Sequence, residues 1–499
     1  MDSPSGFVSK LIVRRNYGRN SSRKSQITNS SYCFVLGFAL ILQVIVSGEI
    51  RPTVMKFGGT SVGDVAAFER VFHIVSTQIE RHPVVVVSAM TKVTDALLAA
   101  FDLAKKGDFA AAVALLEPQF ERHVAVAKHF IADGSSNLFD AELQFAREEL
   151  SDLLMRASRR SLPLSMLKDA IVSYGEQLSS RLLSEVLKSK GVHARQVDSR
   201  RLIVTDNEFG AAQPFIEETN EIVRLELQPS LSGGEVPVMG GFIAGNRAGE
   251  TTTLGRGGSD YSAAIIASAL NASELQIWTD VTGVMTCDPR ICDDARTIPV
   301  LSYEEAAELA YFGAKVLHPK TIKPAIDNAI PVRVCNTFLP DETGTMVLAE
   351  SGEVPNKIKS IASKKNITIV RITSARMLGA YGFMSAVFQV FDRHRTVIDV
   401  ISTSEVSVAL TLDNSEGLEK VVEDLRRLGE VEVETGYAVI CVVGEGLRAS
   451  TGLASKIFST IENVHVELVS HGASAVNLTF VVKETDAAGV IKKLHEEFF

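Results

Sequence analysis

The sequence has few cysteines, and none forms a pair with the spacing of a metal or redox site. The five are Cys33, Cys287, Cys292, Cys335 and Cys441, and no CxxC occurs. Neither a disulfide framework nor a zinc site is expected, and this usage suits a reducing compartment. Cys287 and Cys292 lie in CDPRIC with no histidine nearby, so we interpret them as ordinary thiols rather than metal ligands.

A surplus of positive charge is also missing. The formal net charge is −9, with 46% hydrophobic and 22% charged residues, as in ordinary globular proteins. A basic face for nucleic acid is therefore not expected. The 499 residues exceed what one hydrophobic core usually serves, so we expect two or more domains.

The phosphate-binding motif GxxxxGK[ST] is absent, which argues against a P-loop fold. The segment VVGEGLRAS does match GxGxxA, a dinucleotide-binding pattern. Only about 50 residues follow Ala449, however, which is too few for a dinucleotide-binding domain. We interpret this match as chance.

What is present is an alternation of strand-like and helix-like segments, beginning at Thr53. TVMKF and PVVVVSAM are apolar strands, residues 96–187 have helical spacing, and strand signals return in EVPVMGGFIAG, ELQIWTDVTGV and IPVRVCN. This alternation predicts an α/β fold with a mostly parallel sheet between helices, and a site in the loops at the strand ends.

The pattern loosens between Thr337 and Lys365, where we place a domain boundary. Beyond it, a βαββα pattern occurs twice, first from ITIVRITS to EVEVET and then from YAVICVVGEG to a terminal helix at Asp486–Phe498. Such a repeat predicts open antiparallel sheets with helices on one face. It is typical of ligand-binding or dimerising modules.

Two glycine-rich turns carry charged residues. In KFGGT, Lys56 ends the first strand and two glycines let backbone amides approach an anion, although a tight turn with a surface lysine is an equal interpretation. In GRGGSD, Ser259 and Asp260 begin a helix, where capping alone would explain them. Capping does not explain Arg256, which is suited to a bidentate contact with a carboxylate or phosphate.

Three further segments add candidate residues. WTDVTGVMTCDPR places Thr279 and Asp280 where a sheet edge would hold a nucleotide, or simply in a turn. SYGEQLSS puts Glu176 at a helix start, where helix stabilisation competes with substrate binding. FGAKVLHPKT carries Lys315 and His318, and we interpret His318 as a structural loop residue.

Taken together, KFGGTSV, SYGEQLSSRLL, TTTLGRGGSDYSAA, WTDVTGVMTCDPR and FGAKVLHP, in this order, resemble the aspartate kinase (aspartokinase) family. The resemblance runs from about Thr53 to the C-terminus. STSEVSVALTLD is similar to the monofunctional, lysine-sensitive branch. Because no homoserine dehydrogenase follows Phe499, we expect the monofunctional form.

The resemblance implies an amino acid kinase fold followed by two ACT-like units. The implied reaction transfers the γ-phosphoryl group of ATP to the β-carboxylate of L-aspartate, giving 4-phospho-L-aspartate on the route to lysine, threonine and methionine. The implied cofactor is Mg²⁺ held mainly through the ATP phosphates, with no metal site made by protein residues. Because a carboxylate nucleophile is already ionised, alignment and electrostatics rather than a general base would carry catalysis.

The same resemblance assigns roles to single residues. Lys56 and Asp260 would act in catalysis. The implied nucleotide contacts are Lys56, Phe57, Gly58, Gly59, Thr279, Asp280, Arg290, Lys315 and Val316. The implied aspartate contacts are Thr94, Glu176, Arg256 and Ser259. Glu176 would face the ammonium group and Arg256 a carboxylate, while Met285 stands where relatives commonly have a tyrosine near the nucleotide.

The implied regulatory site lies in the first ACT-like unit. Its residues are Met377, Gly382, Phe383 and Asp399. Asp399 would face the ammonium group of the effector, which by resemblance is L-lysine bound between ACT units of two chains in a homodimer or higher oligomer. Gly379 and Ala380 stand where lysine-sensitive relatives carry polar side chains.

We expect an N-terminal extension at 1–50, a catalytic domain at 51–345, and ACT-like domains at 365–435 and 436–499. In the extension, basic residues precede the apolar run Tyr32–Gly48, which resembles a signal peptide or a short membrane anchor. Because the rest of the chain resembles an enzyme that uses ATP, we expect the protein in the cytoplasm, and we do not expect it to bind a membrane. A non-functional extension, an organelle-targeting segment, and export or anchoring are the alternatives for this segment.

Two other functions compete with this interpretation. Acetylglutamate and uridylate kinases lack the doubled C-terminal module and the SYGE helix. A catalytically inactive, effector-binding regulator would have no need for the charged set Lys56, Arg256, Asp260 and Lys315. We therefore expect an enzyme.

Overall fold

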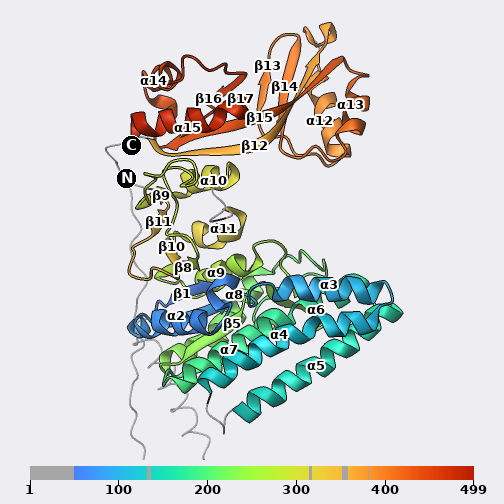
Figure 1. Cartoon of the computed structure of the whole chain (residues 1–499), viewed down its shortest axis with the longest axis vertical. Coiled ribbons are helices and arrows are strands. Elements are labelled where there is room, and N and C mark those ends of the chain that lie inside the picture. The colour runs from blue at the N-terminus through green and yellow to red at the C-terminus, as the bar shows by residue number, and fades with distance from the viewer. Residues whose placement is uncertain (1–49, 132–135, 314–316, 318, 351–357, 380) are drawn as a thin grey trace, which may run out of the picture. The chain divides into compact units, whose positions relative to one another are not determined.

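The computed structural model describes residues 50–499 except 132–135, 314–316, 318, 351–357 and 380 (Figure 1). The strands of its larger sheet are β1 (Thr53–Phe57), β2 (Pro83–Val87), β3 (Ala194–Val197), β5 (Val236–Gly240), β8 (Glu274–Thr279), β9 (Val300–Ser302), β10 (Val332–Asn336) and β11 (Thr345–Leu348). Their order is β3-β5-β2-β1-β8-β10-β11-β9. All neighbours pair in parallel except β10 with β11, which confirms the predicted α/β class.

Helices cover both faces of this sheet. They are α2 (Val65–Ser76), α3 (Val93–Lys105), α4 (Phe109–Phe130), α5 (Ser136–Arg159), α6 (Leu164–Val172), α7 (Tyr174–Ser189), α8 (Ile216–Ser232), α9 (Gly258–Ala269), α10 (Tyr303–Tyr311) and α11 (Pro319–Asp327). Val54 and Val84 join a core with α8 and α9, whereas Met55 and Val85 join a second core with α2, α3, α4 and α7. Burial on both faces explains why PVVVV is apolar at every position.

A smaller sheet supports the turn that contains Arg256. It consists of β4 (Val204–Thr205), β6 (Ile243–Asn246) and β7 (Thr251–Thr253). The Asp169 carboxylate of α6 accepts the backbone N–H of Gly210 and of Thr253, both at 2.8 Å. Because Asp169 is 1% exposed, these two bonds fix the end of β7, just before the turn.

The C-terminal part forms an antiparallel sheet. Its elements are β12 (Ile358–Thr373), α12 (Phe383–Arg393), β13 (Ile401–Thr403), β14 (Ser407–Leu412), α13 (Leu418–Leu425), β15 (Glu430–Gly444), α14 (Leu453–Thr460), β16 (Leu468–His471), β17 (Asn477–Lys483) and α15 (Glu484–Phe498). The strand order is β13-β14-β12-β15-β17-β16, and each neighbouring pair is antiparallel.

The two expected βαββα copies share this one sheet. EVEVET and YAVICVVGEG, expected as separate strands, form the single strand β15, which pairs with β12 on both sides of Gly436. Gly436 has φ 83°, so the glycine bends a continuous strand and does not end it. The domain boundaries stay predictions, and the one at 435–436 falls inside β15.

In the ranges that the structure describes, no helix is both long enough and apolar enough to cross a membrane. The apolar run Tyr32–Gly48 lies outside those ranges.

Candidate active site

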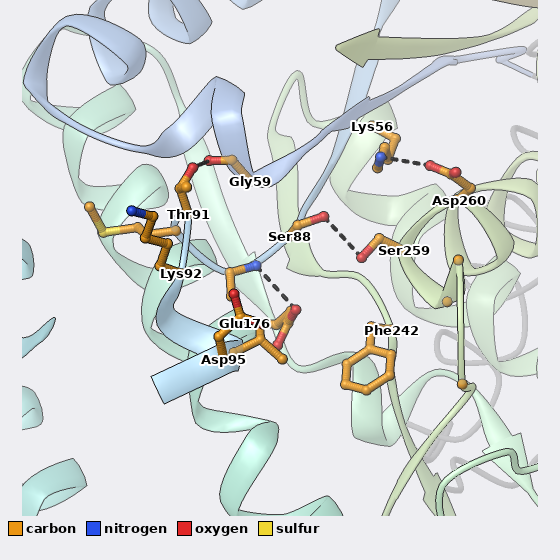
Figure 2. Close-up of a pocket in the computed structure, with 16 residues that line it drawn as sticks. Lys56, Gly59, Ser88, Thr91, Lys92, Asp95, Glu176, Phe242, Ser259 and Asp260 are labelled. Atoms are coloured by element: carbon orange, nitrogen blue, oxygen red, sulfur yellow. Dashed lines mark hydrogen bonds and ion pairs between the residues drawn. The ribbon is translucent and has the colours of Figure 1, made fainter. Parts of the chain in front are cut away.

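A lysine and an aspartate meet where β1 and α9 approach each other (Figure 2). Lys56 Nζ lies 2.7 Å from Asp260 Oδ1, and their side chains are 12% and 17% exposed. Lys56 is near the carboxyl end of β1, and Asp260 is in the first turn of α9. An anion at this place would face an ammonium group held by a carboxylate, together with the amides of a helix N-terminus.

The glycines of KFGGT bring backbone close to backbone. Gly58 N–H donates to Trp278 O at 3.2 Å, which links the ends of the adjacent strands β1 and β8. A Cβ on Gly59 would lie 2.9 Å from Ala89 O, closer than side chains tolerate. The turn after β1 is therefore packed against the loop after β2, and Gly59 is the residue that permits it.

Glu176 is a buried carboxyl group with unused hydrogen-bonding capacity. It lies in the first turn of α7 and is 3% exposed. Its Oε1 accepts Ala89 N–H at 3.1 Å, whereas Oε2 has no hydrogen-bond partner among the described residues. Burial raises the pKa of Glu176 to about 8. A ligand cation at Oε2 would stabilise the ionised form.

These residues line a cavity of about 400 Å³, here named the first cavity. Of the predicted residues, it is lined by Lys56, Gly59, Thr94, Glu176, Ser259 and Asp260. Sequence analysis missed Ser88, Thr91, Lys92, Asp95 and Phe242, which also line it. Ser88 Oγ donates to Ser259 Oγ at 3.0 Å, and Phe242 has φ 66°, a strained value for a non-glycine residue that is common at functional sites.

A cavity of about 490 Å³, the second cavity, adjoins the end of β8. Thr279, Asp280 and Arg290, all predicted nucleotide contacts, line it together with Met285. The Arg290 side chain is 88% exposed and pairs with Asp288 at 2.7 Å, so contact with a ligand would require it to exchange this partner. Part of the wall comes from the C-terminal sheet, through β12 residues 360–363 and Ile491 of α15.

Some predicted residues do not face either cavity. Arg256 is exposed and does not line the first cavity, although Gly255 and Gly257 beside it do. The Phe57 side chain is buried and stacks on Trp278, with ring centres 6.0 Å apart. It can therefore contact a ligand only through its backbone. Lys315, Val316 and Ala380 lie outside the described residues.

The predicted effector residues lie around the start of α12 and before β13. Met377 and Phe383 pack partly buried against the core under α12 and α13, and Gly382 precedes α12 with φ 84°. The Asp399 carboxylate accepts a hydrogen bond from Tyr311 and pairs with Lys364 Nζ at 3.4 Å. Neither partner was predicted, because each lies at least 35 residues away in the chain.

Comparison with known proteins places the chain in a family. Residues 51–336 match the amino acid kinase family, and residues 440–498 match an ACT domain. The chain is 38% identical over 455 residues to lysine-sensitive aspartokinase 3 of Escherichia coli K12, which covers 89% of this chain and 99% of that protein. It is 37% identical over 462 residues to chloroplastic aspartokinase 1 of Arabidopsis thaliana, covering 89% and 80% respectively.

A solved structure of E. coli aspartokinase III with aspartate and ADP is similar in fold. Its TM-score is 0.74 at 37% identity, and the match covers 90% of this chain and 100% of that one. The family model alone covers more than half of the 499 residues. The chain therefore belongs to the aspartokinases, within the amino acid kinase family, and carries a C-terminal region of the ACT type.

Proposed function

We propose that this protein is an aspartate kinase that transfers the γ-phosphoryl group of ATP to the β-carboxylate of L-aspartate. The observation that carries the proposal is the buried Glu176, whose unpartnered Oε2 can receive an ammonium group beside the Lys56–Asp260 pair. The similar structure holds aspartate and ADP, a substrate and a product of this reaction. The product would be 4-phospho-L-aspartate.

The two cavities divide the substrates. Aspartate binds in the first cavity with its ammonium group at Glu176 and its carboxylates near Thr94, Ser259 and the Arg256 turn. The nucleotide binds in the second cavity near Thr279, Asp280 and Arg290, and its phosphates extend to the KFGGT turn. Lys315 and Val316 keep their predicted nucleotide roles.

Catalysis rests on placement of charge. Lys56 neutralises the transferring phosphoryl group, Gly59 offers a backbone N–H group, and Asp260 orients the lysine. Gly58 N–H is bonded to Trp278 O, so the predicted donor role of Gly58 requires that this bond be exchanged for one to the phosphate. The attacking β-carboxylate is ionised at neutral pH, so a general base is not required. Phosphoryl transfer then depends on alignment and electrostatic stabilisation.

Mg²⁺ would be held mainly through the ATP phosphates. This ion commonly uses one or two carboxylates together with substrate phosphates, and Asp260 offers such a carboxylate at the first cavity. The bound ion would supply neutralisation of the phosphate charge.

L-Lysine is the proposed feedback inhibitor, bound at Met377, Gly382, Phe383 and Asp399 between ACT-like units of a homodimer. The Asp399 side chain is 1% exposed, accepts a hydrogen bond from Tyr311 and lies 3.4 Å from Lys364 Nζ. An effector ammonium group would therefore have to displace Lys364, whose nearer partner is Asp413 at 2.7 Å. The relative in E. coli is named lysine-sensitive. Gly379 and the neighbouring Ala380 lack polar side chains, so the affinity for lysine is expected to differ from that of relatives.

The location in the cell and the domain limits are also proposals. We propose the cytoplasm, with organelle targeting by residues 1–50 as the alternative because the Arabidopsis relative is chloroplastic. N-terminal sequencing of the native protein distinguishes them, since a mature start near Gly48 to Met55 indicates removal of the extension. The proposed limits are those predicted above, at 51–345, 365–435 and 436–499.

One assay tests the function. Formation of ADP from ATP is measured with aspartate, acetylglutamate or UMP as the acceptor and with lysine or threonine added, and trapping with hydroxylamine as aspartyl hydroxamate identifies the acyl phosphate product. We expect turnover with aspartate alone and inhibition by lysine. Absence of turnover with lysine binding intact would instead favour an effector-binding regulator, and unchanged activity and thermal stability in saturating lysine would exclude lysine as effector.

A further inference from the structure

Arg122 reaches two loops of the active site from helix α4. Its Nη1 donates to Thr91 O at 2.7 Å and its Nη2 to Gly63 O at 2.8 Å. Nη1 also donates to Gln119 Oε1 at 2.8 Å, one helical turn earlier, which fixes the guanidinium plane. Arg122 itself does not line the first cavity.

The two loops that Arg122 joins carry different substrate contacts. Gly63 caps the C-terminal end of the short 3₁₀ turn Gly59–Val62, which begins at the second of the two glycines proposed to bind phosphate. Thr91 lies in the loop after β2, three residues before Thr94. A separate bond connects the same loops inside the cavity, from Thr91 Oγ1 to Gly59 O at 2.7 Å (Figure 2).

The loop after β2 needs such support. Lys92 has φ 68°, in the left-handed region that non-glycine residues avoid, and it precedes α3 without a side-chain cap. A strained conformation of this kind persists only where surrounding contacts determine it. The hydrogen bond from Arg122 to the preceding carbonyl, Thr91 O, is one such contact, and it is charge-assisted.

We propose that Arg122 is a positioning residue for phosphoryl transfer, which holds the phosphate-binding turn and the aspartate-binding loop at a fixed separation. This inference rests on the proposed aspartate kinase function. A planar guanidinium reaches both carbonyl oxygens at once, whereas a lysine ammonium in its place reaches one. Loss of the link leaves both ligand contacts present but lets the two reacting groups drift apart.

The test compares Arg122→Lys, Arg122→Ala and the control Lys128→Ala, which removes an exposed cation from the same helix. Steady-state kinetics and calorimetric binding of aspartate and ADP are measured on the full chain. We expect kcat to fall about 10- to 100-fold in Arg122→Ala and less in Arg122→Lys, with each binding constant changed by less than about threefold. Lys128→Ala should match the wild type.

Rescue separates positioning from a merely structural role. Millimolar guanidinium should restore part of the kcat of Arg122→Ala and none of that of Lys56→Ala. Wild-type kcat in Arg122→Ala overturns the inference. So does a fall in kcat that is fully accounted for by the loss of folded protein measured by circular dichroism. If Arg122→Ala does not fold, the same criteria apply to Arg122→Lys. An inactive wild type would instead refute the underlying function.

Discussion

The two cavities differ in which parts of the chain build them. The first is lined only by residues between Lys56 and Asp260, whereas the second also contains β12 and α15 of the C-terminal sheet. Ser360 Oγ donates to Met285 O, and Ile361 N–H donates to Thr286 O, both at 2.8 Å. The cavity proposed for aspartate is therefore lined without the C-terminal sheet, while the cavity proposed for the nucleotide shares a wall with it.

A second link joins the regulatory sheet to the catalytic part. Lys359 Nζ of β12 lies 2.8 Å from Glu305 Oε2 of α10, with side chains 4% and 1% exposed. In the Lys56–Asp260 pair, by contrast, both side chains remain open to the cavity. A buried ion pair holds two elements together, because removal of one partner leaves the other charge buried without a counter-charge. A partly exposed pair can exchange partners with a ligand.

The largest effect on the first cavity should come from Lys56→Ala. Removal of one preorganised donor costs about 3 to 4 kcal/mol of transition-state stabilisation, so kcat should fall at least about a hundredfold. Initial-rate assays at saturating ATP and aspartate measure this. Lys128→Ala serves as the control, and near-normal turnover in Lys56→Ala would refute the assignment.

Arg256→Ala and Arg290→Ala form a pair that tests the division of substrates. Loss of a charge-assisted hydrogen bond costs about 1.5 to 3 kcal/mol, so Arg256→Ala should raise the KM for aspartate about 10- to 100-fold and leave that for ATP nearly unchanged. Arg290→Ala should raise the KM for ATP and leave that for aspartate nearly unchanged. If Arg256 stays in solvent when aspartate binds, neither KM will change in its variant.

The pH dependence of aspartate binding follows from Glu176. Its pKa of about 8 means that the free protein holds it protonated at neutral pH, whereas the aspartate ammonium group requires the carboxylate. Binding must then release a proton, so KM for aspartate should rise about tenfold as pH falls from 9 to 7. Glu176→Gln should weaken binding and flatten this profile. A flat wild-type profile would contradict the proposed contact.

The smallest effect should come from Ser360→Ala in the shared wall of the second cavity. The lost hydrogen bond to Met285 O is worth about 0.5 to 1.5 kcal/mol, so KM for ATP should rise about two- to tenfold. KM for aspartate should not change. Ser459→Ala removes an exposed hydroxyl of α14 and is the control. Equal shifts in both KM values would show that the two cavities are not independent.

Lys56 and Asp260 could be predicted from the sequence because each lies next to a recognisable local pattern. Lys56 is at the end of a strand and is followed by glycines, and Asp260 is at the start of a helix and is preceded by glycines. Parallel strands and their following helices gather such positions at one sheet edge, so residues far apart in the chain converge. The first cavity indeed contains both, with Glu176 from a third segment.

No local sequence pattern marks three other residues that make contacts described above, Arg122, Lys359 and Tyr311. Arg122 lies inside an amphipathic helix, where an arginine ordinarily faces solvent, and its partners are carbonyl oxygens that any residue could supply. Lys359 and Tyr311 contact Glu305 and Asp399 across 54 and 88 residues. Local periodicity carries no information on contacts of that range, because many partners would satisfy the same pattern.

The continuous strand β15 has a consequence for how the regulatory part can be divided. Residues Ile358–Lys364 and Ile367 of β12 pair with the second half of β15, which belongs to the second copy, and Ile369–Thr373 pair with the first half. A chain that ends at residue 435 would leave the first half of β12 without its neighbouring strand, so the backbone N–H and C=O groups on that side would have no hydrogen-bond partner. Such an edge invites pairing with another molecule. The two copies therefore depend on each other to fold. A protein shortened at this point is expected to aggregate rather than to remain active without inhibition.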